Sequence, residues 1–500
     1  MDNLIKYISS GVGLSSKKRK KRRKYTALIK LGSHRHGDML LSSDCDSSDD
    51  DYIPEKMKKK NISSKSSQKT LEDKRKRLKE QPIYDAADQS ISEGYGSVWN
   101  TQVPEELLLK IFQLVVADHK LGQRSLIRAS KVCRLWRRIA CDPSLWSRLD
   151  LSYGWIVSPL KAVKSLSEDG RTTHLQHVSV SGCKQVNARF IKILVDEFSE
   201  LKSLDISSCT NVSAVALQMI ASRLLHLEHL NASEIHLTGG RVTAICNVIK
   251  ANQRSLKSLE LSSKVQVSAG SEILKKLSEM NGLTTLDISG FMCSTADLLI
   301  KALKQHAPTL KILRMSRCFV TNFQSKNLEQ SFSYPELIEF TAAEAKLGSA
   351  LSFSHILKEA QCLKHIDVRG WCTSQLTCLQ KESPHTLPPL QTLNLRSVYW
   401  ESSIELDLSQ ISESLEELDI SWMSCNEAAF TAFFDNLMPA SNLKSLYCVG
   451  MPITMRQLRS ILDSCSKLQR IDLESCRRIK RGLKRCHSSP RELKALREQI

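Results

Sequence analysis

The sequence predicts an α/β repeat fold, a solenoid of strand and helix units, preceded by a small all-α module and a basic leader. Three observations support this prediction. A nine-residue phrase recurs twelve times between Leu175 and Cys476, residues 97–146 carry apolar side chains at helical spacing, and residues 1–96 contain blocks of charge. Repetition at such a period is typical of stacked architectures. We therefore expect a leader at 1–96, a helical module at 97–146, a repeat solenoid at 147–476 and a basic tail or cap at 477–500.

The leader is polar and basic. It holds 22 Lys and Arg against 14 Asp and Glu, and so little apolar surface cannot offset the entropy lost on ordering, so we expect disorder. A run of eight basic residues predicts a nuclear import signal that binds an import receptor, with nucleic-acid contact or a solvated tail as alternatives. From this signal we expect the protein in the nucleus, alone or together with the cytoplasm. Its members are Lys17, Lys18, Arg19, Lys20, Lys21, Arg22, Arg23 and Lys24.

Residues 97–146 are expected to form two or three short helices. Pro104 and two acids stand where a helix start prefers them, and the apolar residues at 107, 108, 111, 112 and 115 share one broad face. A polar break at 118–125 is followed by a second predicted helix with apolar positions from 126 to 140. So small a module buries too little core to be stable alone. We therefore expect it to join the repeats directly.

The repeat phrase itself predicts the architecture that follows. Its clearest copies are 201–209, 310–318 and 468–476, which match the leucine-rich-repeat pattern L-x-x-L-x-L-x-x-N/C. The fourth and sixth positions alternate with polar ones, as in a strand with one buried face, and helical spacing often follows. Units of strand, turn and helix share a core only when stacked. We expect about twelve cysteine-type repeats, with a degenerate first one near 145–152.

The strand side of such a solenoid is expected to bind a partner through the third, fifth and seventh positions of each phrase. Six of the twelve fifth positions are acidic, and only Arg314 is basic. These acids are either a stripe that attracts a basic ligand or residues that bond neighbouring backbone. The best mixed patch of charge and aromatic side chains is predicted to bind a protein substrate. Its candidate residues are Asp367, Arg369, Trp371, Arg396, Tyr399 and Asp419.

Motifs for catalysis, metal binding or membrane insertion are not found. The chain has no G-x-x-x-x-G-K-[ST], no H-E-x-x-H and no C-x-x-C, so we expect no catalytic site, no metal and no cofactor. Several of the 16 cysteines fall at the ninth position of the phrase, which indicates reduced, structural thiols. No run of 18 apolar residues occurs, so no membrane span is expected.

Three short segments carry a family resemblance. VPEELLLKIF at 103–112, SKVCRLW at 130–136 and DPSLW at 142–146 resemble an F-box. With cysteine-type leucine-rich repeats directly after them, residues 97–476 resemble the F-box and leucine-rich-repeat proteins, nearest the subgroup called F-box/LRR-repeat protein six. The resemblance implies a non-catalytic substrate receptor of a Skp–cullin–F-box ubiquitin ligase. In that family the F-box binds a Skp-type adaptor on a cullin scaffold, and the repeats hold a protein for ubiquitination and proteasomal degradation.

The resemblance also implies which residues bind the adaptor. Carried over by motif, they are Pro104, Leu107, Leu108, Ile111, Phe112, Val132, Cys133, Trp136, Pro143 and Trp146. The alternative function is a nuclear scaffold that binds nucleic acid or chromatin with its basic leader and tail. The basic residues of that tail are Arg477, Arg478, Lys480, Arg481, Lys484 and Arg485.

Overall fold

A computed structural model describes most of the chain after residue 102. The chain divides into two compact units, Met1–Pro104 and Glu105–Ile500. The second unit contains nearly all of the described residues. The predicted leader, with Lys17 to Lys24, lies outside them. The described ranges are 103–118, 122–154, 158–168, 170–322, 333–347, 360–376, 379–380, 387–401, 404–437 and 440–500.

A 14-stranded sheet runs through the second unit, with neighbours in chain order. Each strand of the repeats covers the third to fifth positions of its phrase, and these positions pair in register along the stack; for example, Leu204 lies opposite Leu230. Pairing is parallel from β1 to β15, and the last strand, β16, is antiparallel. The parallel stack and the rung at Arg148–Asp150 confirm the predicted solenoid and its degenerate first repeat. The strands are β1 (Arg148–Asp150), β2 (His177–Ser179), β3 (Ser203–Asp205), β4 (His229–Asn231), β5 (Ser258–Glu260), β6 (Thr285–Asp287), β8 (Ile312–Arg314), β10 (Glu339–Thr341), β11 (His365–Asp367), β12 (Thr392–Asn394), β13 (Glu417–Asp419), β14 (Ser445–Tyr447), β15 (Arg470–Asp472) and β16 (Cys486–His487).

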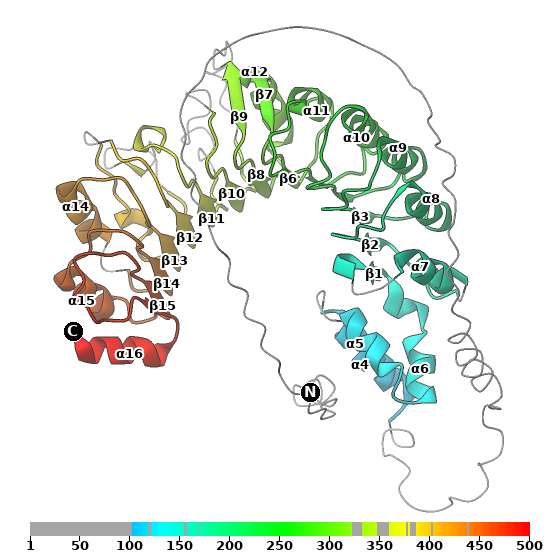
Figure 1. The fold of residues 1–500 in the computed structure, drawn as a ribbon, viewed down its shortest axis with the longest axis horizontal. Helices are drawn as coiled ribbons and strands as arrows, with labels where there is room; N and C mark the ends of the chain where they lie inside the picture. The colour runs from blue at the N-terminus through cyan, green and yellow to red at the C-terminus, as the bar shows by residue number, and fades with distance from the viewer. Residues whose placement is uncertain are drawn as a thin grey trace, which may run out of the picture. The chain divides into compact units, whose positions relative to one another are not determined.

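Within the repeats, helices cover the outer side of the stack, and the strands line its inner side (Figure 1). A second short parallel pair, β7 (Met292–Thr295) with β9 (Phe319–Asn322), joins two neighbouring units. The expectation of a helix in every unit is wrong for the unit of β12, whose described residues hold the 3-10 turn η6 (Ser409–Ile411) instead. The helices of the repeats and the cap are α7 (Pro159–Glu168), α8 (Ala188–Glu197), α9 (Ala214–Arg223), α10 (Gly240–Ala251), α11 (Gly270–Leu277), α12 (Ala296–His306), α14 (Glu427–Leu437), α15 (Met455–Ser464) and α16 (Pro490–Gln499).

The core of the stack is built from the first, fourth, sixth and ninth positions of the phrase. In the second copy Leu201, Leu204, Ile206 and Cys209 are each at most 1 % exposed, and each buried aliphatic side chain stabilises the fold by about 2 kcal/mol. The Cys209 thiol donates to the Val180 carbonyl of the previous unit at 3.0 Å. The ninth-position cysteine therefore satisfies a buried backbone carbonyl between units, as a structural thiol should.

The helical module consists of α4 (Glu105–Val116), α5 (Gly122–Ala129), α6 (Arg134–Ala140) and the 3-10 turn η1 (Pro143–Trp146). The prediction of one second helix over 126–140 is wrong, because two helices occupy that stretch. Cys133 adopts an extended conformation with φ −154° and accepts a hydrogen bond from the Trp136 amide at 3.4 Å, which caps α6. Across the described parts of the chain, every helix is too short or too polar to cross a membrane.

Candidate functional site

The helical module presents an apolar strip on α4. Leu107 is 50 % exposed and Leu114 is 55 % exposed. Ile111, between them, is half-buried, and the spacing of four and three residues puts all three on one face of the helix. Val132, in the turn after α5, is 64 % exposed. Such side chains are costly to leave in water, so the strip is a candidate contact surface.

The adjoining face of α4 holds the module together. Leu108 and Phe112 are 1 % exposed, and the Phe112 ring meets Trp136 edge to face at 5.4 Å between centroids. Trp146 is buried and donates from Nε1 to the Ala140 carbonyl at 2.8 Å. Leu108, Phe112 and Trp146 therefore serve as core.

The remaining predicted adaptor residues are at least partly accessible. Pro104 is exposed, and Cys133, Trp136 and Pro143 are half-buried. The sequence interpretation missed Leu114. Its position seven residues after Leu107 on the same helix was the signal that could have found it.

One side chain of α5, Gln123, contacts the first rung of the solenoid. Gln123 donates from Nε2 to the Arg148 carbonyl, and its Oε1 accepts from the Asp150 amide at 2.6 Å. A neighbouring parallel strand would offer the same donor and acceptor to the free edge of β1. The Gln123 amide therefore replaces that missing strand and fixes the module against the first rung.

A hollow of about 510 Å³ opens beside this junction, between the module and the first rungs. Gln123 and Arg124 line one side, and Arg148, His177 and Asp205 line the other. Burial, followed by the nearby positive charge of Arg148, lowers the pKa of His177. The hollow therefore has a polar lining of mixed sign.

On the inner side of the solenoid, the fifth position serves the backbone. The Asp205 carboxylate accepts from the Ser207 amide at 2.9 Å, and the Asp419 carboxylate accepts from the Ser421 amide at 2.9 Å. Asn394 makes the same bond to the Arg396 amide at 3.0 Å. These contacts favour the interpretation that the acidic residues bond neighbouring backbone, because the neutral amide of Asn394 accepts the same hydrogen bond as the Asp carboxylates.

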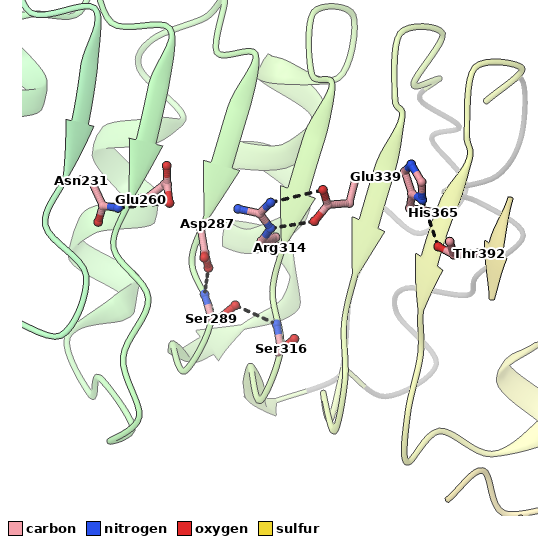
Figure 2. A network of polar contacts seen from close by, with 9 residues as sticks. All are labelled: Asn231, Glu260, Asp287, Ser289, Arg314, Ser316, Glu339, His365 and Thr392. Carbon is pink, nitrogen blue, oxygen red and sulfur yellow. Dashed lines mark hydrogen bonds and ion pairs between the residues drawn. The ribbon is translucent and has the colours of Figure 1, made fainter. Parts of the chain in front are cut away.

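The middle rungs carry a polar network, shown in Figure 2. Arg314 binds both carboxylate oxygens of Glu339, at 2.7 and 3.2 Å, which raises the pKa of Arg314. Burial raises the pKa of Glu260 and of Asp287. Desolvation therefore works against the charged form of both carboxyls at the centre of the predicted acidic stripe.

The predicted substrate residues lie on successive rungs, with one correction. Asp367 and Asp419 are half-buried, and Arg369 and Arg396 are exposed. Trp371 does not fit the prediction, because it is 1 % exposed and its Nε1 donates to the Ala342 carbonyl at 2.7 Å inside the core.

Two aromatic side chains remain on this part of the surface. Tyr399, which the sequence interpretation included, is 60 % exposed. Trp422, which it missed, is 49 % exposed on the next rung. The signal for Trp422 was the glycine at the equivalent position of the following repeat, Gly450, where an added Cβ would come within 2.5 Å of the Trp422 ring.

The described thiols are poor nucleophiles wherever a pKa shift is resolved. Burial raises the pKa of Cys209 and of Cys293 to about 12, and that of Cys425 and of Cys465 to about 11. No cluster of three or more His, Cys, Asp or Glu side chains in the described ranges is placed to hold a metal ion.

The basic tail is partly engaged by the protein itself. Arg478 pairs with Glu427, and Lys484 pairs with Glu492. Arg485 donates to the carbonyls of Cys476 and Ile479 at 3.2 and 3.0 Å. Three of the six basic residues proposed to bind phosphates thus have partners within the fold, which weakens the nucleic-acid alternative.

Known proteins share both parts of this architecture. Residues 101–152 match the F-box-like family. A putative F-box/LRR-repeat protein 9 from Arabidopsis thaliana is 25 % identical over 248 residues, which cover 47 % of this chain and 93 % of that protein. Lysine-specific demethylase 2B from Mus musculus is 24 % identical over 252 residues, which cover 50 % of this chain but only 17 % of the demethylase.

A solved structure shows remote similarity in backbone fold. The crystal structure of the Rad7 and Elc1 complex in yeast matches with a TM-score of 0.44 and 14 % identity, and the match covers 84 % of this chain and 97 % of that one. None of these relatives identifies a subgroup, so similarity to F-box/LRR-repeat protein six stays a prediction. The F-box-like match, the repeat stack and the Arabidopsis relative together make this chain a distant homologue of the F-box/LRR-repeat proteins.

Proposed function

We propose that this chain is the substrate-recognition subunit of a Skp–cullin–F-box ubiquitin ligase. The observation that carries the proposal is the exposed strip of Leu107, Ile111 and Leu114 on a module that matches the F-box-like family. An apolar strip of this kind is suited to an adaptor protein of the Skp type, which would link the chain to a cullin scaffold. The chain itself would catalyse no step and would hold the protein to be ubiquitinated.

The junction supports this division of labour. Gln123 donates one hydrogen bond to the first rung of the solenoid and accepts another from it, and these bonds fix the module there. A protein held on the strand face of the repeats would therefore stay at a defined position relative to the adaptor. Transfer of ubiquitin requires such positioning, because the reacting groups must meet. We place the bound protein on the rungs that carry Asp367, Arg369, Arg396, Tyr399 and Asp419.

Copurification of the full chain with a Skp-type adaptor tests the proposal. We expect the wild type to retain the adaptor, and the triple variant Leu107→Ala, Ile111→Ala, Leu114→Ala to lose at least about tenfold in affinity, because truncated central apolar contacts are costly. Val215→Ala on α9 is the matched control, since Val215 is 60 % exposed on the repeats. A wild-type chain that binds no Skp-type adaptor would refute the proposal.

We also propose that the run Lys17 to Lys24 binds an import receptor and brings the protein to the nucleus. The support is the sequence of that run, which is typical of such signals.

A further inference from the structure

Two neighbouring rungs each carry an exposed arginine, and the two arginines differ in whether they form an ion pair. On the rung of β11, Asp367 accepts both from the Arg369 amide at 3.2 Å and from Arg369 Nε at 3.0 Å, so the guanidinium is paired within its own rung. On the rung of β12 the equivalent residues are Asn394 and Arg396. Asn394 accepts the same hydrogen bond from the Arg396 amide, but its neutral side chain cannot form an ion pair with the guanidinium. Among the described residues Arg396 has no ion pair, and its side chain is exposed.

Two exposed aromatic side chains lie on the same and the next rung. Backbone hydrogen bonds set their spacing. The Ser397 amide, next to Arg396, donates to the Ser421 carbonyl, next to Trp422, at 2.8 Å, and the Tyr399 amide donates to the Trp371 carbonyl at 2.8 Å. Trp422 has a left-handed φ of 58°, and its ring covers Gly450 of the following rung. The backbone at Trp422 therefore lies about one strand spacing, roughly 5 Å, from the Arg396 rung, and the Trp422 ring extends towards the rung that follows.

This combination sets the chemistry of the occupant. An uncompensated guanidinium prefers a carboxylate or phosphate, and half-exposed Tyr and Trp rings gain most from covering an apolar side chain. A cationic occupant would be repelled by Arg396, and the carboxylate of the neighbouring Asp367 already binds Arg369.

We propose that Arg396, Tyr399 and Trp422 form a docking site for a segment of the client protein that carries an Asp or Glu close to an apolar side chain. The inference rests on the proposed receptor function and adds to it the class of segment that is recognised. The carboxylate binds the Arg396 guanidinium, and the apolar side chain covers the two rings.

Short fluorescein-labelled peptides test the site by fluorescence anisotropy with the full chain. Each probe carries one Glu and one Phe at varied spacing, and each has a matched probe with Gln in place of Glu and another with phosphoserine. We expect Glu probes of a preferred spacing to bind at least about tenfold more tightly than their Gln partners, as for a charged hydrogen bond. Arg396→Gln should remove that difference, and Trp422→Ala should weaken the Glu and Gln probes alike.

Asn394→Asp is the sharpest variant, because it copies into the rung of β12 the pair that Asp367 and Arg369 already form. The turn is kept, since Asp makes the same backbone bond on neighbouring rungs. We expect this variant to lose about as much affinity for Glu probes as Arg396→Gln. Asn187→Asp, which adds the same charge at an exposed cap of α8 on a distant repeat and keeps the cap, is the matched control and should retain binding.

Three results would overturn the inference. The first is that no Glu probe binds more tightly than its Gln partner, and the second is that Glu probes still bind both the Arg396→Gln and the Asn394→Asp variant. The third is that only the phosphoserine probes bind. Adaptor copurification with the same variants separates this question from the proposed function. A chain that binds Glu probes but no adaptor retains the docking site and loses the ligase role. A chain that binds the adaptor but no Glu probe retains the ligase role and lacks the docking site.

Discussion

At the scale of single residues, the side chain at the fifth position of the phrase forms a hydrogen bond with the turn, and it can do so whether it is charged or neutral. Asp and Asn both accept a hydrogen bond from the amide two residues later, as Asp205 and Asn394 do. The turn therefore leaves the charge free to vary from rung to rung. That choice decides whether a seventh-position arginine is neutralised, as Arg369 is, or left available, as Arg396 is.

A second residue links burial to pH. His306, on α12, is 0 % exposed, and its Nε2 lies 3.1 Å from the Leu277 carbonyl. Burial lowers the pKa of His306 to about 4. Between this value and about 6.5, the usual value for an unfolded chain, only the unfolded state takes up the proton, so acid favours unfolding. Above pH 6.5 neither state is protonated, and the effect vanishes.

We therefore expect the free energy of unfolding to fall, as pH is lowered from about 6.5 towards 4, by up to roughly 3 kcal/mol from His306 alone. His306→Gln is the matched variant, because its amide can still donate to the Leu277 carbonyl but does not titrate in this range. Thermal melting of both chains at pH 7 and pH 5 measures the difference. Equal pH dependence in the two chains would contradict the assignment.

At the scale of elements, the contact of α5 with β1 determines how the two modules are joined. Gln123 fills the hydrogen-bonding groups of Arg148 and Asp150 on the free edge of the sheet. An edge strand left open frays and invites foreign strands. The same two bonds therefore protect the first rung and hold the helical module in place.

We expect Gln123→Ala to increase the hydrogen-exchange rate of the Asp150 amide at least about tenfold, because the protecting acceptor is removed. Amides of the middle strand β8 should be unaffected, since stacked units respond mainly through their neighbours. Gln469→Ala is the matched control, as Gln469 is an exposed glutamine at the second position of its phrase. Unchanged exchange at Asp150 in the Gln123 variant would show that the junction is held by other contacts.

At the scale of the whole second unit, stability depends on closing the end of the stack. The last parallel strand, β15, pairs with β16, and α16 buries Leu493 and Leu496 to 2 % and 1 % exposure. Arg497 donates to the Leu462 carbonyl of α15 at 2.9 Å. The segment 477–500 is thus a folded cap, and a terminal rung needs such a cover because it has a neighbour on one side only.

We expect Leu493→Ala to cost about 2 to 5 kcal/mol, the usual range for a buried leucine, and to loosen the C-terminal rungs first. Hydrogen exchange of the strands would show faster exchange in β14 and β15 than in β2 and β3. Arg491→Ala, at an exposed position of the same helix, is the control. Loss of protection spread evenly over all strands would indicate that the solenoid unfolds as one cooperative block.

Much of this fold could be predicted because its signals are local. The period of the phrase placed each strand, and its alternation placed Leu204 and Ile206 in the core. Helix breaks were less predictable. The extended conformation of Cys133 divides a stretch whose apolar spacing is continuous, because the cap and the packing of Trp136 on Phe112 outweigh the periodicity.

By itself, the sequence determined the stacked repeat architecture, the position of the helical module and the strip that begins at Leu107, since each follows from side-chain spacing along one element. Only the tertiary structure decided which aromatic side chains are available and how the modules are joined. Trp371 turns into the core and Trp422 lies over Gly450 at the surface, while Gln123 finds its partners on another element. The reason is physical: orientation at a turn and pairing at an edge depend on neighbours that are distant in the chain, and no local spacing encodes them.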